Sequence, residues 1–147
     1  LIDHPEAVLF LVIRRKSDGA WLLYKRSVHP LMGRVGFMHT NPMVELEAPQ
    51  AAQLVCQERT GLKGEFTVLG NGYFRVFENG NLESFTHFSL LVCEDIEGEL
   101  QPNDDHAGYF WLAEPDFSAE EMLPNMLLLS ELYLKGEPFF IEKRLTI

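Results

Sequence analysis

The segment from Gly36 to Gly64 constrains the fold of this chain most, because it confines one short helix between two loops. Pro49 fits the first turn of a helix, where its missing N–H costs nothing. Residues 51–60 contain neither Gly nor Pro, and Gly61 stands where a left-handed residue ends a helix. A helix of about three turns is not stable alone. The rest of the chain must therefore supply a surface that holds it.

Two apolar runs near the N-terminus predict that surface. Residues 7–13 read AVLFLVI and predict a buried strand, and residues 21–25 read WLLYK and predict its return strand after a Ser-Asp-Gly turn. We expect the helix to bury Ala52 and Cys56, which are one turn apart, against the sheet. Leu62 is expected to fix the loop that leaves the helix. The sequence therefore indicates an α/β protein.

The middle of the chain predicts a hairpin. Asn79-Gly80 separates residues 73–78 from residues 82–93, and both runs are rich in apolar and aromatic residues. An Asn-Gly pair between two such runs is the strongest short-range hairpin signal. An earlier strand is expected to begin at Thr67–Leu69, and we expect Asn71-Gly72 to break it.

The last third of the chain predicts a loop, a second helix and a closing strand. Residues 94–105 are acidic and rich in turn formers, which predicts a solvated loop. Ser118 and Glu121 form a capping box for a helical turn, and Pro124 can begin the helix that follows. Residues 126–134 are expected to supply the apolar face of that helix, and Gly136 is expected to end it. Phe139–Ile141 and Leu145–Ile147 predict a closing strand or hairpin.

The composition limits the classes of function. The 147 residues include 12 Lys and Arg and 22 Asp and Glu, which gives a net charge of −10 at pH 7. Binding to a nucleic-acid polymer requires a basic surface, so no such partner is expected. No apolar run reaches the ~18 residues of a membrane span, so no membrane is expected either. Two cysteines give neither a disulfide framework nor a metal-binding spacing. We therefore expect one cytoplasmic domain over residues 1–147.

The segment that contains the short helix resembles the Nudix box, the signature of the MutT-like Nudix hydrolases. That signature reads Gly, five residues, Glu, seven residues, then Arg-Glu-U-x-Glu-Glu-x-Gly-U, where U is aliphatic. Aligned on Thr60-Gly61-Leu62, Glu58 matches the first Glu of the Glu-Glu pair. Three positions differ in the second half of the signature, where Leu54 replaces the Arg, Val55 replaces the next Glu, and Arg59 replaces the last Glu. In the first half, the early Gly falls on Thr40. The box is therefore degenerate.

The resemblance implies the Nudix fold, a mixed β-sheet sandwiched between α-helices (α/β/α), and catalysis with Mg²⁺ or Mn²⁺ held by carboxylates. It assigns the catalytic role and the main metal-ligating role to Glu58. The early Glu of the box falls on Leu46, with Glu45 and Glu47 on either side of it as possible ligands, and Glu47 is expected as the second metal ligand. Asp105 takes the place of a further metal-binding Glu that family members carry shortly before a strand with Trp, here Trp111. Asp104 is the neighbouring candidate for the same place, and the alternative is that Asp104 and Asp105 are both loop charges.

The resemblance also suggests four residues that bind substrate. Lys25 and Arg26 stand where family members carry a Lys-Arg pair, although both could be the solvated end of a strand. Asn125 falls where the oxidised-purine triphosphatases of the family carry an acidic residue that contacts the base, and it is otherwise an early helix residue. Arg59 places a cation where the family holds a metal, and its guanidinium suits bidentate contact with phosphate. The alternative for Arg59 is an exposed ion pair with a neighbouring carboxylate.

Two hypotheses about function follow. In the first, the chain is a hydrolase that uses Mg²⁺ or Mn²⁺ to cleave a nucleoside diphosphate linked to another group, or a nucleoside triphosphate. In the second, the helix has lost too many carboxylates for catalysis, and the domain binds a nucleotide ligand or a partner protein without a metal. The expected partners are a phosphorylated small molecule and, as an open alternative, a second copy of the chain in a homodimer.

Overall fold

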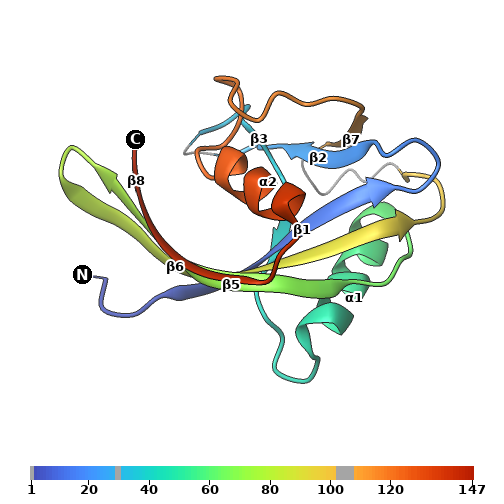
Figure 1. The fold of residues 1–147 in the computed structure, drawn as a ribbon, viewed down its shortest axis with the longest axis horizontal. Helices are drawn as coiled ribbons and strands as arrows, with labels where there is room; N and C mark the ends of the chain where they lie inside the picture. The colour runs from blue at the N-terminus through green and yellow to red at the C-terminus, as the bar shows by residue number, and fades with distance from the viewer. Residues whose placement is uncertain (1, 29–30, 102–107) are drawn as a thin grey trace.

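The computed structural model describes residues 2–28, 31–101 and 108–147. Within these residues a mixed sheet of eight strands is flanked by one helix on each side (Figure 1). The strands are β1 (Glu6–Arg15), β2 (Trp21–Lys25), β3 (Val35–Gly36), β4 (Met38–Thr40), β5 (Thr67–Glu78), β6 (Asn81–Ile96), β7 (Tyr109–Leu112) and β8 (Phe139–Thr146). The helices are α1 (Ala48–Thr60) and α2 (Met126–Lys135). The predicted α/β/α architecture is confirmed.

Strand β1 is the centre of the sheet. The strand order is β3-β2-β1-β6-β5-β8, with β4 also paired to β1 and β7 also paired to β2. β1 and β6 are parallel, β5 and β6 form the antiparallel hairpin predicted at Asn79-Gly80, and β8 is parallel to β5. Beyond the helices, β5, β6 and β8 curve away together (Figure 1). The sheet thus has a covered half and an uncovered half.

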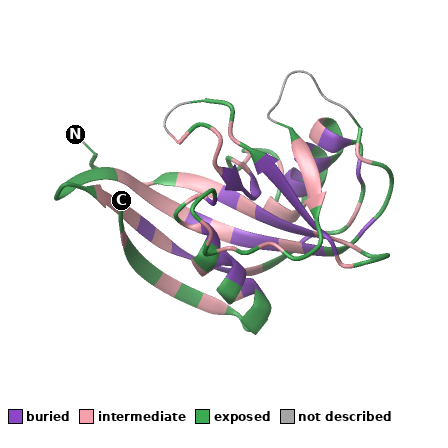
Figure 2. Ribbon diagram, turned by 90° about the horizontal axis from the view of Figure 1, so that it is seen from above, coloured by how far each residue is buried: buried purple, intermediate pink, exposed green. Residues whose placement is uncertain are grey.

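Two hydrophobic cores lie on opposite faces of the sheet, one under each helix. Alternate residues of β1 supply both, since Leu11 faces the core under α1 and Val12 faces the core under α2. The α1 core contains Ala52, Cys56 and Leu62, all essentially inaccessible to solvent, as predicted. Figure 2 shows that buried residues collect between the helices, while the far ends of β5, β6 and β8 are exposed or half-buried.

Glycine ends both helices as predicted. Gly61 follows α1 with φ of 77°, and its N–H donates to the carbonyl oxygen of Gln57 at 2.8 Å. Gly136 follows α2 with φ of 70°. Both residues adopt the left-handed conformation that glycine reaches without a steric penalty. The start of α1 differs slightly from the prediction, because the helix begins at Ala48 and Pro49 lies inside its first turn.

The predicted break at Asn71-Gly72 is wrong. β5 continues without interruption through this pair and is bonded to β6 on one side and β8 on the other. A Cβ atom on Gly72 would collide with the backbone carbonyl of Ile141, and one on Gly70 would collide with the ring of Phe139. These glycines therefore permit the close approach of a neighbouring strand and do not form a turn.

The predicted capping box at Ser118 is also wrong. The side-chain oxygen of Asp116 accepts hydrogen bonds from the backbone N–H of Ser118 at 3.0 Å and from its hydroxyl at 2.6 Å. This local turn replaces a helical one. The helix begins two residues later than expected, at Met126, with Asn125 as its N-cap. The closing segment is one strand, β8, and not a hairpin.

Two short strands, β3 and β4, were not predicted, because two or three residues carry too little pattern to identify a strand. They place the segment before α1 against β2 and β1. Within the described residues, no helix is long and apolar enough to cross a membrane.

We predict that Cys56→Asp lowers the free energy of unfolding by more than about 3 kcal/mol at pH 7, because it places a carboxylate in the α1 core without a charged partner. Urea denaturation measures the loss. Cys56→Ala is the matched control and should cost less, because it removes volume without adding charge. An Asp variant as stable as the Ala variant would contradict the burial of this position against the sheet.

Candidate functional site

Arg59 joins the end of α1 to two strands. Val55 is buried one turn earlier, Glu58 is exposed on the outer side of the helix, and Arg59 is half-buried between them. The Nη1 atom of Arg59 donates to the backbone carbonyl oxygen of His39 in β4 at 2.7 Å, and to the Tyr109 hydroxyl in β7 at 3.5 Å. The guanidinium therefore lies where α1, β4 and β7 meet.

Aromatic and basic side chains surround this point. The ring centroid of Tyr24 is 5.6 Å from that of His39 and 5.9 Å from that of Tyr109. Arg26 follows β2 directly, and its charge acts on both Tyr24 and His39. We call these five residues, Tyr24, Arg26, His39, Arg59 and Tyr109, the Arg59 site.

The hydroxyl of Tyr24 has no hydrogen-bond partner among the described residues, although it is fully shielded from solvent. The residue as a whole is only 7% exposed. Burial raises the pKa of Tyr24, and the nearby cations of Arg26 and Arg59 oppose that rise. The Arg26 guanidinium thus lies close enough to interact with the hydroxyl oxygen, whereas the O–H itself has no acceptor among the described residues. A buried polar atom without a partner is rare in native proteins and unfavourable.

The positive charge of the site comes from its arginines. Burial lowers the pKa of His39, and the charges of Arg59 and Arg26 lower it further, while a contact with the carbonyl oxygen of Phe37 at 3.4 Å opposes the shift. Burial likewise raises the pKa of Tyr109, against the effect of Arg59. His39 and Tyr109 are therefore neutral at pH 7, next to two fixed cations.

Of the four residues predicted to bind substrate, the structure brings two together. Arg26 and Arg59 both lie at the Arg59 site. Lys25 points to the opposite face of β2 from Tyr24 and lies against Gly33. Asn125 is at the N-cap of α2, the helix on the other side of the sheet from α1.

The residues predicted to hold a metal do not form a cluster within the described part of the chain. Glu58 is near the end of α1 and Glu47 is at its N-cap, so the two are separated by about 16 Å along the helix axis at 1.5 Å per residue. Asp105 lies outside the described residues. No group of three His, Cys, Asp or Glu side chains in residues 2–28, 31–101 and 108–147 could bind a metal. This donor set does not fit Mg²⁺, which requires several oxygen ligands in octahedral geometry.

Three residues of the Arg59 site were missed by sequence reasoning. Tyr24 lies in an apolar strand and His39 follows an apolar patch, so neither position carries a pattern that indicates a ligand site. Tyr109 begins the short run that leads to Trp111, and a single Tyr there has no spacing that indicates a site. A weak signal was available at Tyr24, since a Tyr flanked by Leu23 and Lys25 places a polar group at a strand end.

Comparison with known proteins supports the fold alone. No protein-family model matches the sequence, and no curated protein matches it. A mutator MutT protein from Bacillus halodurans is similar in structure, with a TM-score of 0.74 and 14% identity over 96% of this chain and 90% of that one. A MutT Nudix hydrolase from Burkholderia pseudomallei has a TM-score of 0.67 and 19% identity over 88% and 98% of the two chains. A UDP-X diphosphatase has a TM-score of 0.64 and 14% identity over 97% and 69%. The chain therefore has the MutT-like Nudix fold.

We predict that the imidazole of His39 titrates below pH 6.5, because burial and two neighbouring arginines disfavour its protonated form. The unfolded chain then binds this proton at a higher pH than the folded chain. The free energy of unfolding should consequently fall as pH decreases below about 6.5, and His39→Gln should flatten this dependence. NMR titration of the imidazole measures the pKa, and a midpoint at or above 6.5 would contradict the buried position.

Proposed function

We propose that this chain binds the phosphate groups of a small molecule, of the nucleoside diphosphate-linked or nucleoside triphosphate class, at the Arg59 site. The guanidinium groups of Arg59 and Arg26 take the place of a metal ion in this proposal. The chain is then a Nudix-fold binding domain with little or no hydrolytic activity.

The unpartnered hydroxyl of Tyr24 is the observation that carries the proposal. In the unliganded protein this O–H has no acceptor among the described residues, and it lies near two cations. A phosphate oxygen would accept its hydrogen bond and would also be attracted to both guanidinium groups. A neutral acceptor would satisfy only the hydroxyl. The combination therefore favours an anionic ligand with several oxygen atoms.

The position of Arg59 supports the same ligand. Its Nη1 atom is already bonded to the carbonyl oxygen of His39 at 2.7 Å, which fixes the plane of the guanidinium. An Arg held in one orientation loses less conformational entropy when it binds. A flexible surface Arg would not be expected to hold this bond to the His39 carbonyl. The alternative prediction for Arg59 was a different contact, an exposed ion pair with a neighbouring Glu.

Hydrolysis is the second candidate function, and the UDP-X diphosphatase among the similar structures is the observation that favours it. Glu58 would hold Mg²⁺ or Mn²⁺ in that case, with Glu47 and Asp105 as the other predicted ligands. The spacing of Glu47 and Glu58 and the presence of Val55 and Arg59 on the same helix weaken this candidate. Fold similarity cannot decide between the two, because one fold hosts many functions.

We predict that Tyr24→Phe has opposite effects on stability and on ligand binding. Removal of the unpartnered hydroxyl should raise the free energy of unfolding by about 1 kcal/mol, and loss of the donor should weaken nucleotide binding by about tenfold. Calorimetric titration in EDTA measures binding to ADP-ribose, UDP-sugars and nucleoside triphosphates, and urea denaturation measures stability.

The arginines supply the controls for this experiment. Arg26→Ala should weaken binding by tenfold or more and make it less sensitive to salt, since a charge-assisted bond contributes ~1.5–3 kcal/mol. Lys25→Ala removes an equal charge from the opposite face of β2 and should leave binding unchanged. Binding that requires Mg²⁺, or that is equal in the parent, Tyr24→Phe and Arg26→Ala proteins, would contradict the proposal.

We also predict that the free protein binds Mg²⁺ without saturation below about millimolar concentration, because one exposed carboxylate is a poor site. Calorimetry without nucleotide tests this. Release of phosphate or pyrophosphate from the same nucleotide panel, with Mg²⁺ or Mn²⁺, tests for hydrolysis. Turnover that disappears in Glu58→Gln would establish the hydrolase and overturn the proposal of a binding domain.

A further inference from the structure

The outer edge of β8 has open backbone hydrogen-bonding positions. β8 is the last strand in the sheet order, and its only pairing within the described residues is with β5. The backbone N–H of Ile147 donates to the carbonyl oxygen of Phe77 in β5 at 2.9 Å, so the backbone groups of the odd-numbered residues of β8 point toward β5. Because the backbone groups of successive residues point to alternate sides of a strand, those of Phe140, Glu142 and Arg144 point away from β5. A second strand could pair with them.

We propose that β8 pairs in antiparallel orientation with β8 of a second copy of this chain, about a two-fold axis at Lys143. This joins the two sheets into one. The proposal rests on the sequence and edge position of β8 and is independent of the proposed ligand site.

The charges of β8 select this register. With Lys143 on the axis, Glu142 lies opposite Arg144 of the second copy, and Arg144 lies opposite its Glu142. The two neighbouring registers that keep each residue on the correct face of the sheet would place Glu142 opposite Glu142, or Arg144 opposite Arg144. Opposite charges across a strand pair are favourable and like charges are unfavourable. A self-complementary contact of this kind is what a two-fold dimer requires.

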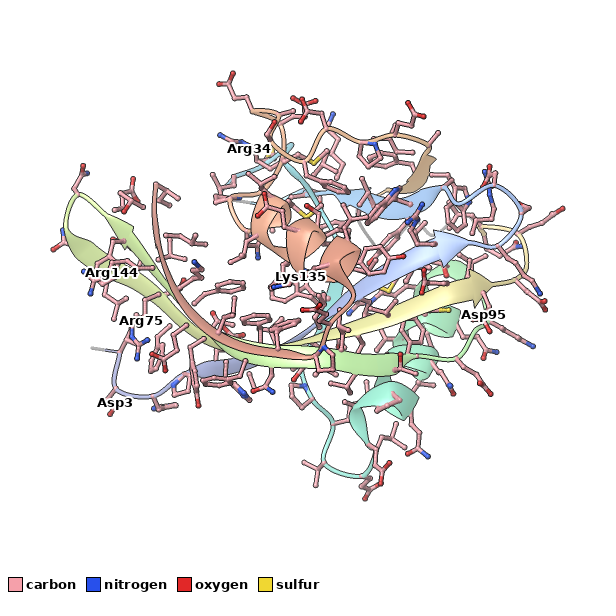
Figure 3. All side chains as sticks on the ribbon, in the orientation of Figure 1. Asp3, Arg34, Arg75, Asp95, Lys135 and Arg144 are labelled. Atoms are coloured by element: carbon pink, nitrogen blue, oxygen red, sulfur yellow. The ribbon has the colours of Figure 1, made fainter. Side chains whose placement is uncertain are left out.

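Side chains on one face of the joined sheet reinforce the pairing. The Oε2 atom of Glu142 is 3.8 Å from the Nη1 atom of Arg75 in the same chain. Arg75 in β5 lies opposite Arg144 in β8, so the two side chains lie on the same face of the sheet (Figure 3). The guanidinium of Arg144 lies 4.4 Å from the centroid of the Phe77 ring, which restrains it. The Glu142 carboxylate would thus lie between two arginines: Arg75 of its own chain and Arg144 of the second copy.

Apolar residues on the other face also match. Ile141 and Leu145 of β8 both pack at the edge of the core under α2 and are half-buried. The same register places Ile141 opposite Leu145 of the second copy, on both sides of the axis. Each copy therefore covers apolar surface that the other leaves half-exposed, and the α2 cores of the two copies meet at the joint.

Lys143 makes the dimer weak. It lies on the axis, opposite Lys143 of the second copy, and a like pair opposes association. One strand pair also buries less than the roughly 1,600 Å² of a standard interface. The expected dissociation constant is on the order of micromolar, with monomer and dimer both present at accessible concentrations.

Sedimentation equilibrium over a concentration series tests the charge pairing. Glu142→Arg should weaken the dimer by at least about tenfold. Adding Arg144→Glu should recover part of that loss, because the pairs between the two copies are inverted while the contact of residue 142 with Arg75 becomes repulsive. Lys143→Thr should strengthen the dimer. Thermal melting confirms that each variant folds. A parent chain that stays monomeric at millimolar concentration, or a dimer that is indifferent to Glu142→Arg, would overturn the proposal.

Disulfide trapping tests the register directly. Residues 143 would form a non-hydrogen-bonded pair with Cα atoms about 4.5 Å apart, within the range that a disulfide spans. Lys143→Cys should therefore oxidise to a covalent dimer. Glu142→Cys is the matched control, since its Cα atoms would be more than about 7 Å apart and could not be bridged. The natural cysteines, Cys56 and Cys93, are both buried. Equal cross-linking of the two variants, or of neither, would show that this register is wrong.

Discussion

The parallel pairing of β1 with β6 is the interaction on which the rest of this structure depends. It runs from Glu6 opposite Thr86 to Arg15 opposite Ile96, with one irregularity near its end. Both strands carry apolar side chains on both faces where they pair, so each helix packs on residues that this pair supplies. β4 is bonded to the other edge of β1. The carbonyl of His39, which holds Arg59, is therefore placed by the same strand that supports α1.

The exchange of a carboxylate for Arg59 changes packing as well as charge. A carboxylate at this position could only accept hydrogen bonds, and it could not bond to the carbonyl oxygen of His39. The guanidinium donates to that oxygen and to the hydroxyl of Tyr109, so it joins the helix to two strands. An Arg59→Glu substitution would leave the His39 carbonyl without this donor. Return of a metal-binding carboxylate would therefore require changes in β4 and β7, and not only in the helix.

The sequence predicted the elements whose structure depends on a local pattern of neighbouring residues. The helix at α1 and the hairpin at Asn79-Gly80 were predicted from capping residues and from the alternation of apolar residues, which act locally. The break expected at Asn71-Gly72 was wrong. Gly72 allows the backbone of β8, about 70 residues further along the chain, to pack closely against β5. A local pattern cannot report such a contact.

The site was predictable only in part for the same reason. Arg59 and Arg26 were identified as candidate ligand residues, and the structure places both near Tyr24. Tyr24, His39 and Tyr109 come from three different strands, and their proximity depends on the pairings of β2 with β7 and of β1 with β4. Lys25 shows the limit of proximity in sequence, since it is adjacent to Arg26 but points to the other face of the strand.

The pairing of β1 with β6 also affects how the chain folds. The hairpin of β5 and β6 is local, whereas the pairing of β1 with β6 joins residues about 80 positions apart in the sequence. Contacts of long sequence separation slow folding, because a large loop must close before they form. During synthesis β1 leaves the ribosome well before β6 exists. The apolar run that organises the finished sheet thus lacks its β6 partner in the unfinished chain, where an unpaired apolar strand is prone to aggregation.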